Sequence, residues 1–349
     1  MIGILYALLV LGLLILVHEF GHFIFAKLFG VGVKTFSLGF GPKILSKKIG
    51  ETEYALSVLP LGGYVAMVGE DDEAECDPEK SFRSKHVFKR ILIVLAGPLF
   101  NLLLGFVFFA AVFMFYGTPV LTNHIGATTK NNPAERAGIV AGDRVVAING
   151  AVVNSWDDIT KIMSQYKGDG PITVVVERGD ALLLMKMKPE LVDDKNIFGE
   201  PVKRYVLGIT PAPPVLEKGL EKGVIQSAKT TANVTALTAL GIWKLIGGKI
   251  SSDNVGGPIL ITQMAGEAAS MGFEALLMFT GLISISLFVM NVLPIPALDG
   301  GHIWLFCLEW IRGRPLSKRT QERIQSVGVT MLIALMLFAF YNDISRFFK

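Results

Sequence analysis

The sequence has few charged residues and very few cysteines. Charged residues make up 18% of its 349 positions, against roughly 25% in typical globular domains, whereas 51% are hydrophobic and the mean hydropathy is +0.51. This composition excludes a disordered chain, a collagen-like chain and a disulfide scaffold. A net charge of +3 without a basic stripe argues against a nucleic-acid partner. Both cysteines, Cys76 and Cys307, fall in segments that we place on the reducing side of a membrane, so we expect no structural disulfide.

Long apolar runs predict a multi-pass α-helical membrane protein, because about 20 apolar residues cross a bilayer. Four spans are expected, at residues 1–25, 91–116, 273–293 and about 328–341, the last within a C-terminal segment 327–349. The first run lacks a preceding basic residue and a cleavage site, so we interpret it as a retained helix rather than a signal peptide. It spans only if His18, Glu19 and His22 lie at membrane depth, where polar residues are costly and usually functional.

Basic residues indicate the orientation of these spans. Lysine and arginine cluster in residues 26–90, between the first two spans, and in residues 294–326, between the last two. Both loops are therefore expected in the cytoplasm, with both termini and residues 117–272 outside it.

The outer segment is expected to begin with a small α+β module at residues 117–212. Alternating apolar residues predict strands at 145–148, 172–177 and 181–187, and a helix at 155–166. In the linker 213–272, the helical pattern at 223–246 is interpreted as an interfacial amphipathic helix, because a fifth span would contradict the charge-derived topology.

The first cytoplasmic loop contains a glycine-rich segment, residues 31–68, that alternates like short strands. Strand edges at membrane depth are tolerated only where protein or a water-filled cavity covers them. We therefore expect membrane-associated β-structure beside a cavity.

The sharpest chemical signal is His18-Glu19-Phe20-Gly21-His22. Residues four apart share a helix face, so both imidazoles can bind one zinc ion while Glu19 acts as general base toward the water that zinc activates. The alternative is a pair of helix histidines in ordinary hydrogen bonds. Apolar surroundings weaken that alternative, because uncompensated polar residues are costly there.

A hydrolytic zinc site usually has a third protein ligand, and Asp299 is the best candidate. Pro294 and Pro296 should end the third span at membrane depth, so that Asp299 arrives on extended backbone. Its other interpretation, compatible with the first, is N-cap of a helix that restarts toward Trp310. We expect His302 to pack beside the site.

The other polar candidates carry less information. Asn101, inside the second span, either bonds a neighbouring helix, which we favour, or lines the active-site cavity. His86 and His124 are expected to be surface residues of loops.

Three motifs together resemble those of a known family. The segments H-E-F-G-H (18–22), G-P-L-F-N (97–101) and N-V-L-P-I-P-A-L-D-G-G (291–301) resemble the site-2 protease family of intramembrane zinc metalloproteases, in its bacterial RseP-like branch. The similarity covers essentially the whole chain in the expected order. Residues 125–189 resemble a permuted bacterial PDZ domain; RseP itself carries two in tandem, and this chain has room for one.

The resemblance implies regulated intramembrane proteolysis in the bacterial inner membrane. Substrates would be single-pass membrane proteins already trimmed outside by a first protease, such as anti-sigma factors, in sigma-factor signalling, or remnant signal peptides. The resemblance assigns Zn²⁺ to His18, His22 and Asp299, general-base catalysis to Glu19, and substrate binding to Asn291, Pro294 and Pro296. The glycine-rich segment would receive the unwound substrate as an added strand, and the PDZ domain would be able to bind a peptide C-terminus.

Three alternatives remain open. A membrane-anchored zinc peptidase could cut segments at the surface, although His18, about 16 residues into the first span, favours the membrane. A transporter could use the same residues as an ion pathway, but the sequence lacks the internal repeats expected of many transporters. A non-catalytic PDZ adaptor would lose nothing in a Glu19→Gln variant, whereas the enzyme would lose proteolysis and keep zinc.

Overall fold

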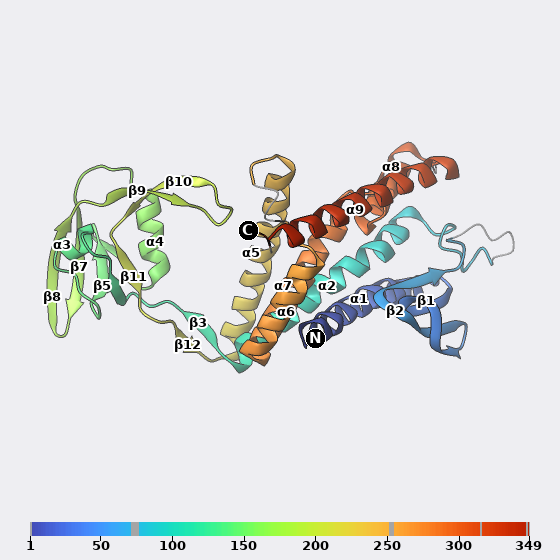
Figure 1. The fold of residues 1–349 in the computed structure, drawn as a ribbon, viewed down its shortest axis with the longest axis horizontal. Coiled ribbons are helices and arrows are strands. Elements are labelled where there is room, and N and C mark those ends of the chain that lie inside the picture. Colours follow the sequence, from blue (N-terminus) through green and yellow to red (C-terminus); the bar gives the residue numbers. More distant parts are fainter. Residues whose placement is uncertain (1, 71–76, 251–254, 315, 347, 349) are drawn as a thin grey trace. The chain divides into compact units, whose positions relative to one another are not determined.

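The computed structural model describes residues 2–70, 77–250, 255–314, 316–346 and 348 (Figure 1). Two compact units are separated by their internal contacts: a helical unit (residues 1–112, 225–243 and 251–349) and a β-rich module (residues 113–224 and 244–250). Cys76 lies outside the described residues, and Cys307 is a free thiol.

The helical unit contains the long apolar helices. Its elements are α1 (Ile2–Leu28), β1 (Val33–Ile49), β2 (Thr52–Met67), α2 (Val87–Phe115), most of α5 (Leu220–Ile246), α6 (Pro258–Met271), α7 (Phe273–Val292), α8 (Asp299–Arg312) and α9 (Lys318–Arg346).

Four helices of the described chain are long and apolar enough to cross a membrane: α1, α2, α7 and α9. This agrees with the four expected spans. The fourth was placed too narrowly, because α9 begins ten residues before 328 and takes up Arg319 and Arg323, which we had assigned to the loop. These residues project from the first turns of a helix whose apolar stretch starts later. Helix α5 is not among the four.

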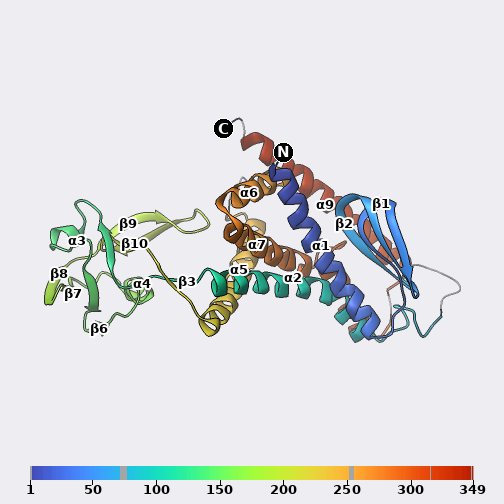
Figure 2. The ribbon, with the colours of Figure 1, turned by 90° about the horizontal axis from the view of Figure 1, so that it is seen from below.

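The glycine-rich segment forms β1 and β2, which lie beside α1 (Figures 1 and 2). The first half of β1 pairs with both halves of β2, so that Phe36 lies opposite Tyr54 and also opposite Val65. The second half of β1 continues the sheet in the hairpin Lys43–Ser57 to Ile49–Thr52. Two long strands thus fold back into a sheet wider than a simple hairpin, which the alternation alone does not specify.

Helix α6 was missed in the linker. It packs along α1 and α7, and its buried Ala265 and Ala268 share a core cluster with Ala7, Val10 and Leu14 of α1. Its apolar run is too short to predict a membrane span. The polar residues within it are typical of a linker. The helix that carries the two candidate histidines is therefore packed by α6 as well.

The β-rich module is built from twelve short elements. They are β3 (Thr118–Val120), β4 (Ile125–Thr128), α3 (Pro133–Arg136), β5 (Arg144–Ile148), β6 (Ala151–Val152), α4 (Trp156–Gln165), β7 (Ile172–Arg178), β8 (Ala181–Met187), β9 (Glu190–Lys195), β10 (Pro201–Val206), β11 (Ile209–Pro211) and β12 (Val215–Glu217).

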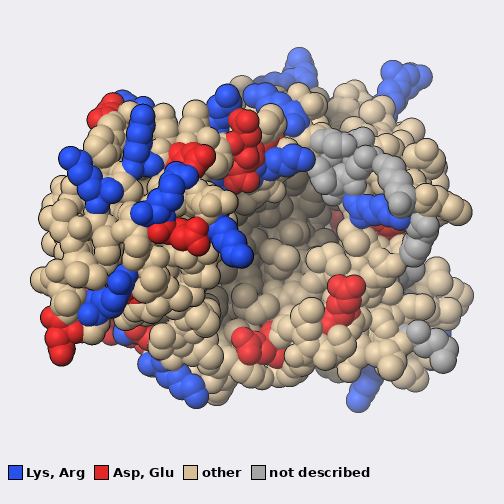
Figure 3. All heavy atoms as spheres, turned by 60° about the vertical axis from the view of Figure 1, so that its left-hand side comes forward, with Lys and Arg blue, Asp and Glu red and all other residues tan. Residues whose placement is uncertain are grey.

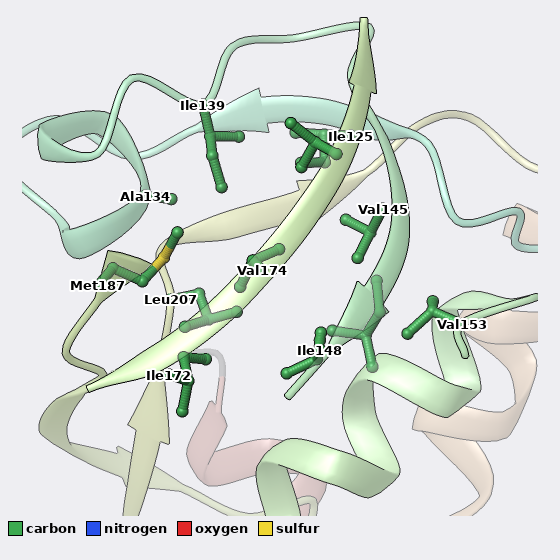
Figure 4. Packing of buried hydrophobic residues seen from close by; sticks show 12 residues of the cluster. Ile125, Ala134, Ile139, Val145, Ile148, Val153, Ile172, Val174, Met187 and Leu207 are labelled. Atoms are coloured by element: carbon green, nitrogen blue, oxygen red, sulfur yellow. The ribbon is translucent and has the colours of Figure 1, made fainter. Parts of the chain in front are cut away.

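A four-stranded antiparallel sheet, in the order β6-β5-β7-β8, forms the centre of this module. Alternate residues of β7, such as Ile172 and Val174, and Val145 and Ile148 of β5 point into a core that α3 and α4 close (Figure 4). The three predicted strands and the predicted helix are present within one or two residues. Pairs β9–β10, β4–β11 and β3–β12 complete the module.

Charged side chains of both signs are interspersed on the face shown in Figure 3. This distribution fits the small net charge.

Candidate metal centre

Two imidazoles of α1 face the same point. His18 and His22 lie one turn apart, with Nε2 atoms 3.2 Å from each other, and their side chains are 13% and 10% exposed. Tetrahedral zinc with Zn–N bonds of about 2.0–2.1 Å separates two nitrogen ligands by about 3.3 Å. The helix thus holds the imidazoles at the spacing that a shared metal ion requires.

Each imidazole is held through its other nitrogen. His22 Nδ1–H donates to the carbonyl oxygen of Ile93 on α2 at 2.9 Å. His18 Nδ1 lies 3.2 Å from the side-chain nitrogen of Asn101, two turns further along α2. Histidine ligands usually have such a partner on the nitrogen that does not bind the metal.

A tight turn between α7 and α8 presents the third candidate ligand, Asp299. Leu298 N–H donates to Ile295 O at 3.0 Å across a turn with Pro296 and Ala297 at its centre. Ala297 has φ +81°, the sign that the third residue of a type II turn requires and that normally selects glycine. A left-handed alanine beside a functional carboxylate is a strained residue held by its surroundings.

The expectation for the backbone of Asp299 was wrong in detail. Leu298 is the extended residue that precedes the helix, and Asp299 is the first residue of α8. Leu298, not Asp299, occupies the N-cap position, so the N-cap interpretation is also wrong. The prolines end α7 but the chain re-enters a helix after one turn, and this frees the carboxylate to face α1.

Asp299 completes a three-residue cluster with the two histidines. One carboxylate oxygen lies 3.0 Å from His18 Nε2 and the other 3.6 Å from His22 Nε2. The first of these, Oδ2, is buried and accepts no hydrogen bond of acceptable geometry among the described residues. Within the described chain these three are the acidic, histidine or cysteine residues whose donor atoms converge within 4.8 Å. Two imidazoles and a carboxylate with an unpartnered buried oxygen form a ligand set that fits a zinc ion.

A glycine of α2 makes room for the imidazoles. A Cβ atom at Gly97 would lie 2.3 Å from His22 Nε2 and 3.0 Å from His18 Cε1. Because no side chain fits there, the backbone of α2 forms one wall of the cluster.

Glu19 lies beside the sheet. Its side chain is half-buried, and a Cβ atom at Gly63 of β2 would lie 3.0 Å from Glu19 Cγ. The backbone of β2 therefore passes close to the methylene part of the Glu19 side chain, in contact with the helix that carries the two histidines. Nothing in the sequence distinguishes Gly63, among several glycines of the segment, as the residue that makes this contact.

The remaining candidates lie at the end of α7, in the turn after it, in α8 and in two loops. Asn291 belongs to the last turn of α7, and Pro294 and Pro296 lie in the following turn, Pro294 exposed and Pro296 half-buried. His302, one turn into α8, lines a small cavity with Pro296 and packs near Phe306, which fits a packing residue. His86 and His124 are exposed, and their imidazoles accept or share hydrogen bonds with neighbours two residues away, Phe88 N–H and Thr122 Oγ1.

Asn101 bonds neighbouring helices, as we favoured. Its backbone carbonyl accepts a hydrogen bond from Ser284 of α7 at 2.6 Å, and its side chain contacts His18. A polar residue inside an apolar span was the signal, but its partner could not be predicted from one sequence.

Comparison with known proteins shows the family to which this chain belongs. The family model described as "Peptidase family M50" matches residues 6–335. A predicted zinc metalloprotease of Clostridium acetobutylicum is 37% identical, over 98% of this chain and 97% of its own length. Another, of Campylobacter jejuni, is 38% identical over 97% of this chain and 92% of its own.

Among solved structures, the PDZ domain of an SdrC-like protein from Listeria monocytogenes covers 25% of this chain and 84% of its own, with 19% identity and a TM-score of 0.21. That similarity is too low to classify the β-rich module. The family match, in contrast, spans most of the chain and includes all three motifs. The chain therefore belongs to peptidase family M50, the site-2 protease family, and is a zinc metallopeptidase.

Proposed function

We propose that this metallopeptidase cuts peptide bonds within the transmembrane helices of single-pass membrane proteins. The observation that carries the proposal is the position of the cluster. His18 and His22 lie in an apolar helix of membrane-spanning length, and Asp299 is brought to them by a turn that follows another such helix. A substrate bond must reach the same depth to be cut.

In this proposal His18, His22 and Asp299 hold the zinc ion. Zinc bound there supplies an electropositive centre that activates water and polarises the scissile carbonyl group. Glu19, one residue from His18 on α1, accepts a proton from the attacking water at its carboxylate and passes it to the leaving amine nitrogen. Its half-buried position against Gly63 limits where that carboxylate can move.

A transmembrane helix cannot be cut while its carbonyl groups are engaged in hydrogen bonds. We infer that the substrate unwinds locally and pairs with the β1–β2 sheet, which offsets part of the cost of its lost hydrogen bonds. The contact between Gly63 and Glu19 supports this, since a strand added near that part of β2 lies close to the proposed base. Asn291, Pro294 and Pro296 are proposed to hold the substrate from the α7–α8 side.

The topology follows from the charged flanks. We propose a bacterial inner-membrane protein with both termini and the β-rich module outside the cytoplasm, and with the metal centre toward the cytoplasmic side. Helix α5 is proposed to lie at the interface, since its apolar content is below that of the four candidate spans.

The substrates are proposed to be of the RseP-like class: anti-sigma factors or remnant signal peptides that a first protease has shortened outside. The β-rich module is proposed to act as a single PDZ domain that binds the new peptide C-terminus. A cavity of about 520 Å³ between α4 and residues 205–210, lined by Trp156, Ile159 and Met163 among others, supports a peptide site there. It lies at β11, the partner strand of β4.

The Glu19→Gln variant tests the proposed chemistry. It removes the base without changing the side-chain volume or the three proposed ligands. We expect the purified variant to retain one equivalent of zinc and to lose at least about 100-fold in cleavage rate, the usual contribution of a general base. Undiminished cleavage would reject Glu19 as the base.

The location of the cut bond tests intramembrane proteolysis itself. Mass spectrometry of the products from a model single-pass substrate should place the cut within its apolar helix. A helix with Gly, Pro or small polar residues should be cut faster than a uniformly Leu-rich one, because it unwinds more easily. Equal rates would contradict the unwinding step, and cuts confined to exposed segments would favour a surface peptidase.

A further inference from the structure

Asn101 is the polar group nearest the metal centre whose role the proposed mechanism leaves open. It lies in the middle of α2 and is 1% exposed. A buried amide in an apolar helix is costly unless all its polar atoms find partners. Its side-chain nitrogen lies 3.2 Å from His18 Nδ1, but its oxygen Oδ1 is buried with no hydrogen-bond partner among the described residues.

The two ends of a side-chain amide differ in the hydrogen bond that they impose on His18. If the NH₂ group faces Nδ1, the imidazole must carry its proton on Nε2, which points toward His22 Nε2 and Asp299. That proton would occupy the lone pair that a metal ion needs. Turning the amide by 180° leaves its shape almost unchanged and places Oδ1 against Nδ1–H.

The turned amide suits a metal-bound His18. It gives Asn101 Oδ1 the donor that it lacks, and it leaves Nε2 of His18 as a bare lone pair. The bare Nε2 then faces Asp299 Oδ2, another buried oxygen without a hydrogen bond. Three lone-pair donors in one place repel one another unless a cation lies between them, so this orientation belongs to the metal-binding state.

His22 does not depend on a side chain in this way. Its Nδ1–H donates to a backbone carbonyl, that of Ile93, which has no alternative orientation. Among the two imidazoles, only His18 has a partner that a substitution can remove.

We propose that Asn101 is a positioning residue for His18: its Oδ1 accepts the hydrogen bond of His18 Nδ1–H and so directs the Nε2 lone pair at the zinc ion. The inference rests on the proposed ligand role of His18. It concerns metal affinity, whereas the proposed function concerns which bond is cut.

The test compares zinc affinity in three full-length variants by competition with a chelator in detergent. Asn101→Leu has a similar volume and no acceptor, and we expect its zinc affinity to fall about 10- to 100-fold, as for other lost partners of ligating histidines. Asn101→Asp keeps an acceptor at the same place and should stay within about threefold of the wild type. Ser284→Ala, which removes only the bond to the Asn101 backbone, is the control for helix packing and should bind zinc normally.

Wild-type affinity in Asn101→Leu would overturn the inference, and so would equal losses in the Leu and Asp variants. If Asn101→Leu fails to fold, Asn101→Ala, which also lacks an acceptor, takes its place with the same expected loss, and zinc affinity equal to that of the wild type in this variant would overturn the inference. If the wild type binds zinc and cuts no membrane helix, the proposed function fails while this result stands.

Discussion

At the scale of single residues, the absence of a side chain shapes the metal centre as much as the side chains that are present. Gly97 allows the backbone of α2 to touch both imidazoles, while the Ile93 carbonyl, one turn earlier, fixes His22. A small residue is therefore required at one position and a backbone acceptor at the other. The proposed ligands could be predicted from the sequence, since the motif and the costly polar residues point to them; these backbone contacts could not.

Gly97→Ala should weaken zinc binding. The added Cβ would lie 2.3 Å from His22 Nε2, so α2 or the imidazole must move. We expect at least about a tenfold loss of zinc affinity, as when a supporting contact of a ligand is lost, measured by chelator competition. Gly12→Ala on α1 is the control, because its Cβ would meet nothing within 4 Å. Equal affinity in the two variants would show that the close contact is unimportant.

A buried ion pair makes the stability of the β-rich module depend on pH. Arg178 donates to both oxygens of Asp143, at 2.7 and 2.9 Å, and the Asp143 side chain is fully buried. The Arg178 guanidinium holds the pKa of Asp143 below its ordinary value. Because the folded pKa is depressed, the stabilisation is present above the unfolded pKa, about 3.9, and is lost as pH falls through the folded value.

The protection of the β5 and β7 amides in the full-length protein, measured as their exchange rate relative to that of the unfolded chain at the same pH, should therefore fall below about pH 4. Arg178→Ala leaves Asp143 buried without its cation. In this variant the free energy of local opening should be about 2 kcal/mol lower than in the wild type even at pH 7, so the same amides should exchange faster. Identical protection in the wild type and the variant at pH 7 would contradict the account.

At the scale of elements, the sequence predicts helices well and their connections poorly. The charge-free run of α2 and the strands of the module have patterns that their local environment enforces. In contrast, β1 and β2 pair in two registers that depend on α1 beside them, and the Ile295–Leu298 turn depends on packing that holds Ala297 at φ +81°. Tertiary contacts outweigh local preference at both places.

The strained turn predicts an unusual order of substitutions. Ala297→Gly should keep or increase zinc affinity, because glycine adopts the left-handed conformation without cost. Ala297→Val should lower the affinity, because a β-branched residue resists positive φ and the turn that presents Asp299 would shift. Chelator competition on both variants measures this, and a valine variant that binds zinc as well as the glycine variant would contradict it.

Asp343 joins two helices that the sequence did not connect. Its buried carboxylate accepts hydrogen bonds from the backbone N–H groups of Gly257, Ile259 and Leu260 at 2.9–3.1 Å, and so caps the N-terminus of α6. Asp343→Ala should leave these donors without their acceptor. The free energy of local opening at Gly257, Ile259 and Leu260 should then fall by about 2 kcal/mol, which is measured as faster amide exchange. Asp343→Asn, which keeps one acceptor oxygen, should lie between. Unchanged protection in the alanine variant would mean that packing on α1 and α7 holds α6 without the cap.

At the scale of the whole molecule, the centre joins residues from the two ends of the chain. His18 and His22 come from α1 and Asp299 from the start of α8, and α2 and the β1–β2 sheet enclose them. Sequence alone could nominate the three residues, because each motif has its own chemical signature. It could not supply the distances between them, which depend on how α1, α2 and the turn after α7 pack.

The most direct test of the account is anomalous diffraction at the zinc edge from crystals of the full-length protein. The account predicts one strong peak about 2.0–2.2 Å from His18 Nε2, His22 Nε2 and a carboxylate oxygen of Asp299, and loss of this peak in Asp299→Ala. A zinc ion bound elsewhere, or one that remains in place without Asp299, would contradict it.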